Sequence, residues 1–446
     1  MPAFRAPFLA AFFALIIIGP GAGQNVTVLS DVRLIDGTGK PPVDHATIFI
    51  QNTTIRDIFL GISAVRTPKN ARVLHLSGKT VMPGIINGHG HVGLVQGTTV
   101  SPDNYTEVNI ARQLLQYQRY GVTTMISLGM NQDLLYRIID EQRSGEMNGA
   151  TVLTADRGIG VPEGMPPVKV GPEQIYRPQT PDEAREAVRE MAERGPTLIK
   201  IWVDTNLGQL PTANPAIYRA AIEEAHRLHV RVAAHVFYLA DAKNLLTDGV
   251  DILAHSVRDQ PLDAGTLAQM KKQGVYYIPT LQLEESFFIY ATHPSWMDSL
   301  FFRQGVNREL SKLFNSPEYK AKVEADKNTP IHQQALRAAM LNAKQALDAG
   351  VNVAFGTDSG ANPFRIQGFA EHRELQLLVE AGFTPLEAIH SATEMTARML
   401  AIANRTGTLA KSKDADILVL DGDPSSDIRN AQKLDMAFHL GRLTNR

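Results

Sequence analysis

The sequence predicts an α/β fold, a (β/α)8 TIM barrel with a small β-sandwich domain formed from both termini. Three observations predict it: eight strand-like runs occupy the middle of the chain, amphipathic helical stretches separate them, and both ends carry β patterns without helices. A chain of 446 residues is long enough to bury both units. A doubly wound open sheet is the alternative, but it would not gather residues from five separated strand ends around one point.

Residues 1–23 have the pattern of a secretory signal peptide. Arg5 is the only charge before an apolar run from Phe8 to Ile18, and small residues follow it. The run is short for a membrane span, which needs about 20 residues, and no later stretch approaches that length. We therefore expect export to a periplasm or to the exterior, with an uncleaved anchor as the alternative.

Residues 24–78 and 405–446 are expected to form the composite β-sandwich. Apolar and β-branched residues alternate with polar ones in Val26–Leu29, Ala46–Ile50 and Ala415–Leu420. Because each end is too small to hold a core alone, we expect the two to pack together.

Residues 79–404 carry the pattern of the barrel. The strand-like runs are Thr80–Ile86, Val122–Ser127, Thr151–Thr154, Thr197–Val203, Val230–Val236, Asp251–His255, Val275–Pro279 and Val351–Gly356. Helical stretches lie between them, such as Pro181–Glu193, whose first turns are acidic.

An aromatic-rich segment, residues 282–329, interrupts the alternation of strands and helices after the seventh strand-like run. An insertion there lies on the face of such a barrel that carries chemistry. We interpret it as a lid, with a packing or oligomer surface as the equal alternative.

The composition excludes several classes of protein. Lys and Arg total 44 and Asp and Glu total 46, so no strong field attracts nucleic acid or an anionic membrane. Cysteine is absent, which excludes disulfides, thiolate nucleophiles and Cys-ligated zinc. Any bound metal must use His, carboxylate and similar ligands.

His89 and His91 follow the apolar run that begins at Pro83. Because alternate side chains of a strand share a face, these two imidazoles emerge on the same side and can bind one divalent metal. Such a pair occurs easily by chance, so its meaning depends on the rest of the chain.

Further candidate ligands mark the carboxyl ends of later strands. They are Lys200 in the fourth run, His235 after the fifth, His255 after the sixth and Asp358 after the eighth. Taken singly, a histidine could be structural, Lys200 could pair with Asp204, and Asp358 could cap a helix. These readings do not explain why the residues mark the same end of the strands. His45, His75, His226, His229, His332 and His439 fall elsewhere, and we predict no role for them.

Lys200 lies inside an otherwise apolar run. A buried ammonium is costly, and neighbouring cations would repel it. A desolvated, neutral amine can react with CO2, and the resulting carbamate has two oxygens that can bridge two metals. The predicted ligands are His89, His91 and Asp358 on one metal and His235 and His255 on the other, with carboxylated Lys200 and a solvent hydroxide between them. Such donors favour zinc, with manganese, cobalt or iron as alternatives.

In this order, the residues resemble the amidohydrolase superfamily, in particular its binuclear members related to imidazolonepropionase-like proteins, prolidases and ochratoxin-hydrolysing amidases. The resemblance rests on the split β-sandwich, Met82-Pro83-Gly84, the ligands named above and Gly356-Thr357-Asp358, and it covers essentially the whole chain after residue 23. It implies a metal-dependent hydrolase of amide or peptide bonds that uses a hydroxide held by two cations.

The resemblance and the spacing assign roles to three residues. Asp358 would take the proton from the attacking water and deliver it to the leaving amine. Tyr238, three residues after His235, resembles a tyrosine with which related enzymes bind the carbonyl oxygen, and a loop aromatic is the alternative. Arg258, three residues after His255, is expected to bind a substrate carboxylate, with a surface arginine as the alternative.

We therefore expect a secreted or periplasmic enzyme that cleaves a small-molecule amide next to a free carboxylate, such as a dipeptide, an N-acyl amino acid or an ochratoxin-type aryl amide. A lactone, cyclic amide or phosphotriester hydrolase could use the same centre. A metal-stabilised binding protein without turnover is the alternative from another class. Related barrels often assemble, which favours a homo-oligomer, and we expect no nucleic-acid partner and no membrane association after signal cleavage.

Overall fold

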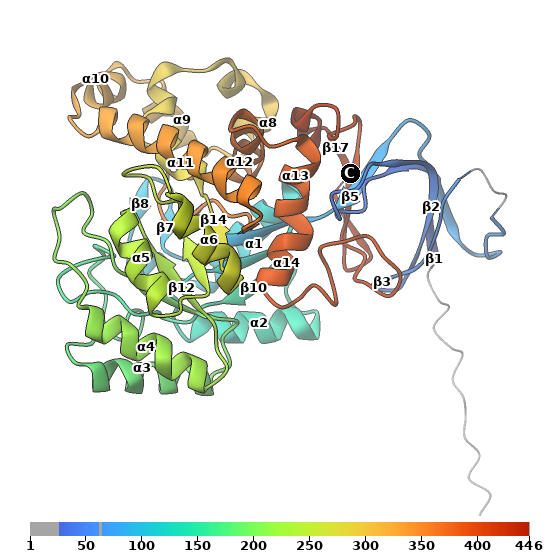
Figure 1. The fold of residues 1–446 in the computed structure, drawn as a ribbon. Coiled ribbons are helices and arrows are strands. Elements are labelled where there is room, and N and C mark those ends of the chain that lie inside the picture. Colours follow the sequence, from blue (N-terminus) through green and yellow to red (C-terminus); the bar gives the residue numbers. More distant parts are fainter. Residues whose placement is uncertain (1–25, 62–64, 446) are drawn as a thin grey trace, which may run out of the picture.

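The computed structural model describes residues 26–61 and 65–445, so the predicted signal peptide at residues 1–23 lies outside the described residues. Two units stand side by side in Figure 1, a β-sheet at the right and a larger α/β unit at the left. Within the described ranges, no helix is long and apolar enough to cross a membrane.

Strands from both ends of the chain form one eight-stranded sheet. Its members are β1 (Val26–Leu34), β2 (Val43–Gln51), β3 (Thr54–Phe59), β4 (Arg72–His75), β5 (Thr80–Pro83), β16 (Ile417–Leu420), β17 (Leu434–His439) and β18 (Arg442–Asn445). The order is β18-β17-β16-β5-β1-β2-β3, with β4 on β1. Because β5 pairs with β1 on one side and with β16 on the other, the two ends of the chain share one sheet.

The structure divides the first predicted barrel strand at Gly84. Thr80–Pro83 form β5 of the terminal sheet, and Ile85–Gly90 form β6 of the parallel unit. A Cβ atom on Gly84 would lie 2.2 Å from the Thr123 side chain, so only glycine lets the chain pass there. The continuous apolar run does not reveal this division, because both strands are buried on all sides.

Eight parallel strands follow each other in chain order. Strands β6, β9 (Val122–Ser127) and β10 (Thr151–Thr154) form one sheet, and the other five form a second sheet. The second sheet comprises β11 (Ile199–Trp202), β12 (Val232–His235), β13 (Ile252–Ala254), β14 (Tyr276–Ile278) and β15 (Asn352–Val353). Backbone hydrogen bonds join the two sheets at both edges, from Thr197 to Thr154 and from Gly88 to Phe355, each 2.9 Å long. These contacts confirm the α/β class and are those that a closed barrel requires.

Helices separate and surround these strands. They are α1 (Glu107–Arg119), α2 (Leu134–Ser144), α3 (Pro181–Glu193), α4 (Pro215–Arg227), α5 (Leu239–Thr247), α6 (Ala264–Gln273), α11 (Thr329–Ala349), α12 (Phe369–Glu380), α13 (Pro385–His390) and α14 (Thr396–Met399). Helix α3 has the predicted bounds, because the Thr180 hydroxyl accepts a hydrogen bond from the Glu183 amide and Pro181 occupies the first turn. Shorter elements complete the chain: β7 (Val95–Gln96), β8 (Thr99–Val100), the 3-10 helices Pro102–Asn104 and Ile428–Gln432, and the π-helix Ser391–Met395.

The aromatic-rich segment folds into short helices above the parallel strands, at the top left of Figure 1. They are α7 (Leu281–Glu285), Ile289–Thr292, Ser295–Asp298, α8 (Leu300–Arg303), α9 (Arg308–Phe314) and α10 (Pro317–Ala325). Their aromatic rings stack on one another, with Tyr290 and Phe314 at 4.2 Å between centroids, and Phe302 reaches Phe369 of α12 at 4.8 Å. The segment therefore has its own small core, which also packs on α12.

Candidate metal centre

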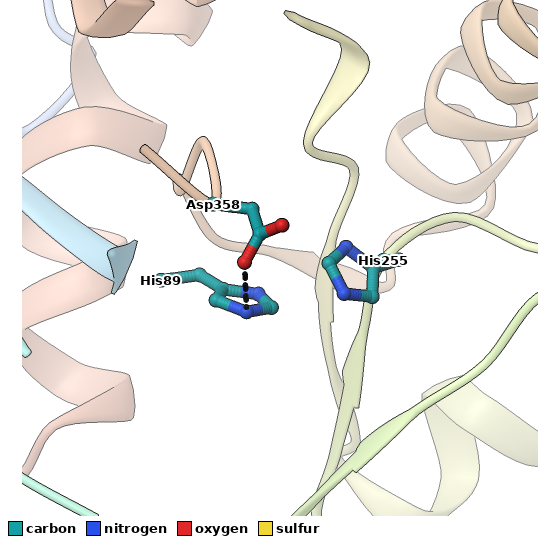
Figure 2. Close-up of side chains that lie close together, drawn as sticks. All are labelled: His89, His255 and Asp358. Carbon is teal, nitrogen blue, oxygen red and sulfur yellow. Dashed lines mark ion pairs between the residues drawn. The ribbon is translucent and has the colours of Figure 1, made fainter. Parts of the chain in front are cut away.

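His89 and His91 converge on Asp358. His89 lies in β6 and His91 follows it, and their Nε2 atoms lie 3.2 and 3.0 Å from Oδ1 of Asp358. Figure 2 shows His89 and Asp358 facing each other, with His255 beside them. The Asp358 amide donates to the His89 carbonyl at 2.6 Å, which ties the end of the eighth strand to the first.

Asp358 is held as a carboxylate. Burial alone would raise its pKa, but the guanidinium of Arg365 and the imidazoles of His89 and His91 hold the pKa well below its usual range. Arg365 donates through Nη1 to the second oxygen, Oδ2. One oxygen of Asp358 therefore faces the two histidines and the other faces an arginine.

His235 and His255 extend the cluster. The ring of His255 lies 4.4 Å from that of His89 and 4.4 Å from that of His235, measured between centroids. Burial lowers the pKa of both His235 and His255, so both imidazoles are neutral at neutral pH, the form that binds a metal.

Hydrogen bonds orient these two rings. Nδ1 of His255 lies 2.8 Å from the hydroxyl of Thr280, and Nε2 of His235 is bonded to the carboxylate of Asp204. A nitrogen that donates its proton in this way leaves the opposite ring nitrogen free as a ligand. With Nδ1 of His255 and Nε2 of His235 as the donors, Nε2 of His255 and Nδ1 of His235 would be the ligand atoms.

Lys200 lies in β11 beneath the cluster. Its Nζ lies 3.5 Å from Nε2 of His89, and the side chain is buried. Burial lowers the pKa of Lys200 to about 7, although the charges of Asp358 and Asp204 oppose this shift. A large fraction of this amine is therefore neutral at neutral pH.

The structure thus brings all six predicted ligands together in one buried, connected cluster. Donor atoms of His89, His255 and Asp358 lie within 4.8 Å of one another, and His91, His235 and Lys200 contact this trio. Neutral imidazoles with one carboxylate are a donor set that suits a divalent cation such as zinc. The residues present therefore fit a metal.

A cavity of about 320 Å³ opens onto the cluster. Arg258 lines it, but its Nε donates to Glu284 at 2.6 Å and its Nη1 donates to the carbonyls of Val236 and Ser256. Tyr238 is half-buried at the start of α5 and is not among the described residues that line the cavity, where Phe237 lies instead. The carbonyl-binding role of Tyr238 stays a prediction.

The sequence of residues 80–443 matches the family model described as the amidohydrolase family. The chain belongs to the amidohydrolase family. This assignment confirms the resemblance drawn from the sequence and the predicted enzyme class, a hydrolase that acts on amide bonds. Enzymes of this family are generally metal-dependent, in agreement with the cluster.

This amidohydrolase is similar to the ochratoxinase of Aspergillus niger, with 26% identity over 95% of this chain and 87% of the relative. The crystal structure of the A. niger ochratoxinase superposes with a TM-score of 0.72 at 22% identity, over 94% of this chain and 95% of the other. A Xaa-Pro dipeptidase crystallised with bound methionine superposes with a TM-score of 0.75 at 23% identity, over 94% and 99%. These solved structures share the fold of this amidohydrolase.

Several residues of the amidohydrolase site escaped the sequence reasoning. Asp204 contacts His235, whereas the sequence suggested Lys200 as its partner. The sequence feature that could have revealed Asp204 was its position just after the strand that carries Lys200. His332, for which we predicted no role, lines the cavity and bonds to Glu284 at 2.7 Å. The sequence did not indicate this position, because α11 brings His332 back to the cavity only after a long insertion.

Glu371 is the most connected of these residues. Its buried carboxylate accepts hydrogen bonds from Asn87, Thr357 and Ser359, each at 2.7 Å. These three residues flank His89 and Asp358 in the chain, so Glu371 clamps the two strand ends that carry the ligands. No sequence signal marks it, because its partner Asn87 lies 284 residues before it in the chain.

Proposed function

We propose that this chain is an exported, binuclear metal-dependent amidohydrolase that cleaves an amide bond next to a free carboxylate. Dipeptides, N-acyl amino acids and aryl amides of the ochratoxin type are the substrate classes. The observation that carries the proposal is the buried convergence of His89, His91, Lys200, His235, His255 and Asp358. The names of the relatives, an ochratoxinase and a Xaa-Pro dipeptidase, support this choice of substrates.

The architecture that we propose is a (β/α)8 barrel at residues 79–404 with a composite β-sandwich from residues 24–78 and 405–446. In such a barrel the active site lies at the carboxyl ends of the strands. The candidate ligands occupy these ends, and residues 282–329 would cover them as a lid. Leu283, Glu284 and Phe287 of this segment line the cavity, which supports the lid interpretation.

Two divalent ions, zinc by donor type, are expected to share the centre. His89, His91 and Asp358 would hold one ion, His235 and His255 the other, and carboxylated Lys200 would lie between them. Bound cations polarise the amide carbonyl and make hydroxide available near neutral pH.

The chain itself would perform the proton transfers. The neutral amine of Lys200 forms a bond to the carbon of CO2 and releases one proton to solvent, which yields the carbamate. Asp358 accepts a proton from the attacking water and donates it to the amine that leaves. Its lowered pKa keeps it ionised at neutral pH, the form that can accept a proton.

The cavity favours a substrate with a large apolar group. Met130, Met165, Trp202 and Phe237 line one part of it, beside Leu283 and Phe287 of the aromatic-rich segment. Arg258 and Arg365 are its cationic groups. An aromatic or aliphatic acyl group would pack on the apolar wall, and Arg365 would favour an anionic substrate.

The test is a screen of zinc-loaded enzyme against dipeptides, N-acyl amino acids, aryl amides, lactones and phosphotriesters, combined with metal analysis. Two ions per chain and turnover of the carboxylate-bearing amides support the proposal. Turnover of lactones or phosphotriesters alone would show that the centre serves another substrate. A chain without metal and without turnover would favour a binding protein.

A further inference from the structure

We propose that Arg365, and not Arg258, binds the free carboxylate of the substrate. This inference rests on the proposed hydrolysis of an amide next to a carboxylate. It concerns the side of the cavity where the loop after β15 meets the aromatic-rich segment.

Arg258 is already neutralised inside the cavity wall. It is buried, and it forms an ion pair with Glu284, whose side chain is 3% exposed. Its Nη1 is used by two backbone carbonyls, at 2.8 Å to Val236 and 2.9 Å to Ser256. The Nε and Nη2 edge of Arg258 is therefore already used, because its Nε donates to Glu284. Arg258 therefore stabilises the wall of the cavity and does not bind the substrate carboxylate.

Arg365 has an unused hydrogen-bonding edge. Its side chain is 10% exposed, and it contacts Asp358 through Nη1. Its Nε is buried and has no hydrogen-bond partner among the described residues. A buried N–H without a partner costs free energy, and the Nε and Nη2 edge of a guanidinium matches the two oxygens of a carboxylate. The unused edge of Arg365 therefore suits a carboxylate ligand.

An aromatic stack holds Arg365 in place. Its guanidinium carbon lies 5.4 Å from the ring centroid of Phe287. His332 stacks on the same Phe287 at 3.9 Å with an interplanar angle of 14°. Nδ1 of His332 bonds to Glu284, the partner of Arg258. Arg258 and Glu284 thus support, through His332 and Phe287, the surface on which Arg365 lies.

The position also suits the reaction. Because Nη1 of Arg365 contacts the proposed proton shuttle Asp358, a carboxylate on the other edge would lie one guanidinium away from Asp358. That separation fits a carboxylate on the residue that carries the amide nitrogen. The leaving group would then be an amino acid.

The experiment compares two substrates that differ only in charge, an N-acyl phenylalanine and its carboxamide. The measured quantity is the acid preference, the ratio of their kcat/KM values with zinc-loaded enzyme. We expect Arg365→Gln to lower this ratio roughly tenfold to a hundredfold, the effect of one charge-assisted contact. Any effect of Arg365→Gln on Asp358 changes both substrates alike and cancels in the ratio.

Two variants serve as controls. Arg258→Gln should slow the hydrolysis of both substrates together and keep the ratio. Arg308→Gln changes an exposed arginine of the aromatic-rich segment and should keep the ratio as well. Thermal unfolding of each variant reports on folding. If the ratio falls in Arg258→Gln and stays in Arg365→Gln, or if the wild type shows no acid preference, the assignment of Arg365 is overturned.

A binding measurement tests the carboxylate site independently of the proposed hydrolysis. If the wild type hydrolyses neither substrate, calorimetry measures the binding of the same acid and carboxamide to the zinc-loaded protein. Selective binding of the acid that disappears in Arg365→Gln supports the carboxylate site while hydrolysis fails. Equal binding of acid and carboxamide to the wild type overturns the carboxylate site as well.

Discussion

The carboxylate of Asp204 accepts a hydrogen bond from Nε2 of His235 at the ends of two adjacent parallel strands, β11 and β12. The other oxygen of Asp204 accepts the amide of Asn206 at 2.6 Å. Burial opposes the charge of Asp204, but its contact with His235 holds its pKa below the usual range. This arrangement uses Nε2 of His235, so Nδ1 is the ring nitrogen left for a metal.

Replacing Asp204 by Asn should weaken the metal site formed by His235 and His255. An amide accepts a weaker hydrogen bond than a carboxylate, and loss of such a partner typically reduces metal affinity by about 10- to 100-fold. Metal content measured by mass spectrometry in zinc-buffered solutions checks this. Asp140→Asn, at an exposed position of α2, is the matched control. Unchanged binding of two ions would show that Asp204 does not orient His235.

Thr280 should be required to orient His255. Its hydroxyl lies 2.8 Å from Nδ1, and its φ of 49° is unusual for a β-branched residue. Thr280→Val keeps the branched shape and removes the hydroxyl, so we expect about a tenfold loss of metal affinity. Thr280→Ser keeps the hydroxyl and should retain affinity. Equal affinities of the two variants would contradict a role for this hydrogen bond.

Lys200 should make the stability of the metal-free protein depend on pH. Burial lowers its pKa from 10.5 to about 7, so between these values the unfolded chain binds a proton that the folded chain does not. The free energy of unfolding therefore rises with pH from about 7 to 10.5 and is lost as pH falls through this window. Relative to Lys200→Met, the wild type should gain on the order of 4 kcal/mol across it.

Chemical denaturation in metal-free, CO2-free buffer at several pH values measures this difference. Lys327→Met changes an exposed lysine, so its free energy of unfolding should depend on pH as that of the wild type does. Parallel curves for wild type and Lys200→Met would mean that the amine is charged in the folded protein, which would weaken the case for a carbamate.

Asp358→Asn should abolish most turnover while the fold is kept. An amide cannot accept and return the proton, and the loss of a general acid–base group costs roughly 100- to 10,000-fold in rate. The measurement is kcat at saturating zinc with a substrate found in the screen, together with metal content and thermal unfolding. Near-normal turnover with both ions bound would exclude Asp358 as the proton shuttle.

Much of this protein was readable from its sequence. The eight strand-like runs correspond to the eight parallel strands, and Thr180 with Pro181 marked the start of α3. The six candidate ligands were found because imidazole, amine and carboxylate groups are rare at the ends of apolar runs and carry chemistry there. Local patterns suffice for these features, since they depend on strand period, helix capping and residue type.

The tertiary structure alone decided which groups face one another. It paired Asp204 with His235 and Arg258 with Glu284, and it moved Thr80–Pro83 into the terminal sheet. It also left Nε of Arg365 without a hydrogen-bond partner among the described residues. Hydrogen-bond partners in a folded chain are set by which elements become neighbours, often over hundreds of residues. The spacing of residues along the sequence does not encode these partners, because they meet only when the strands and the aromatic-rich segment pack together.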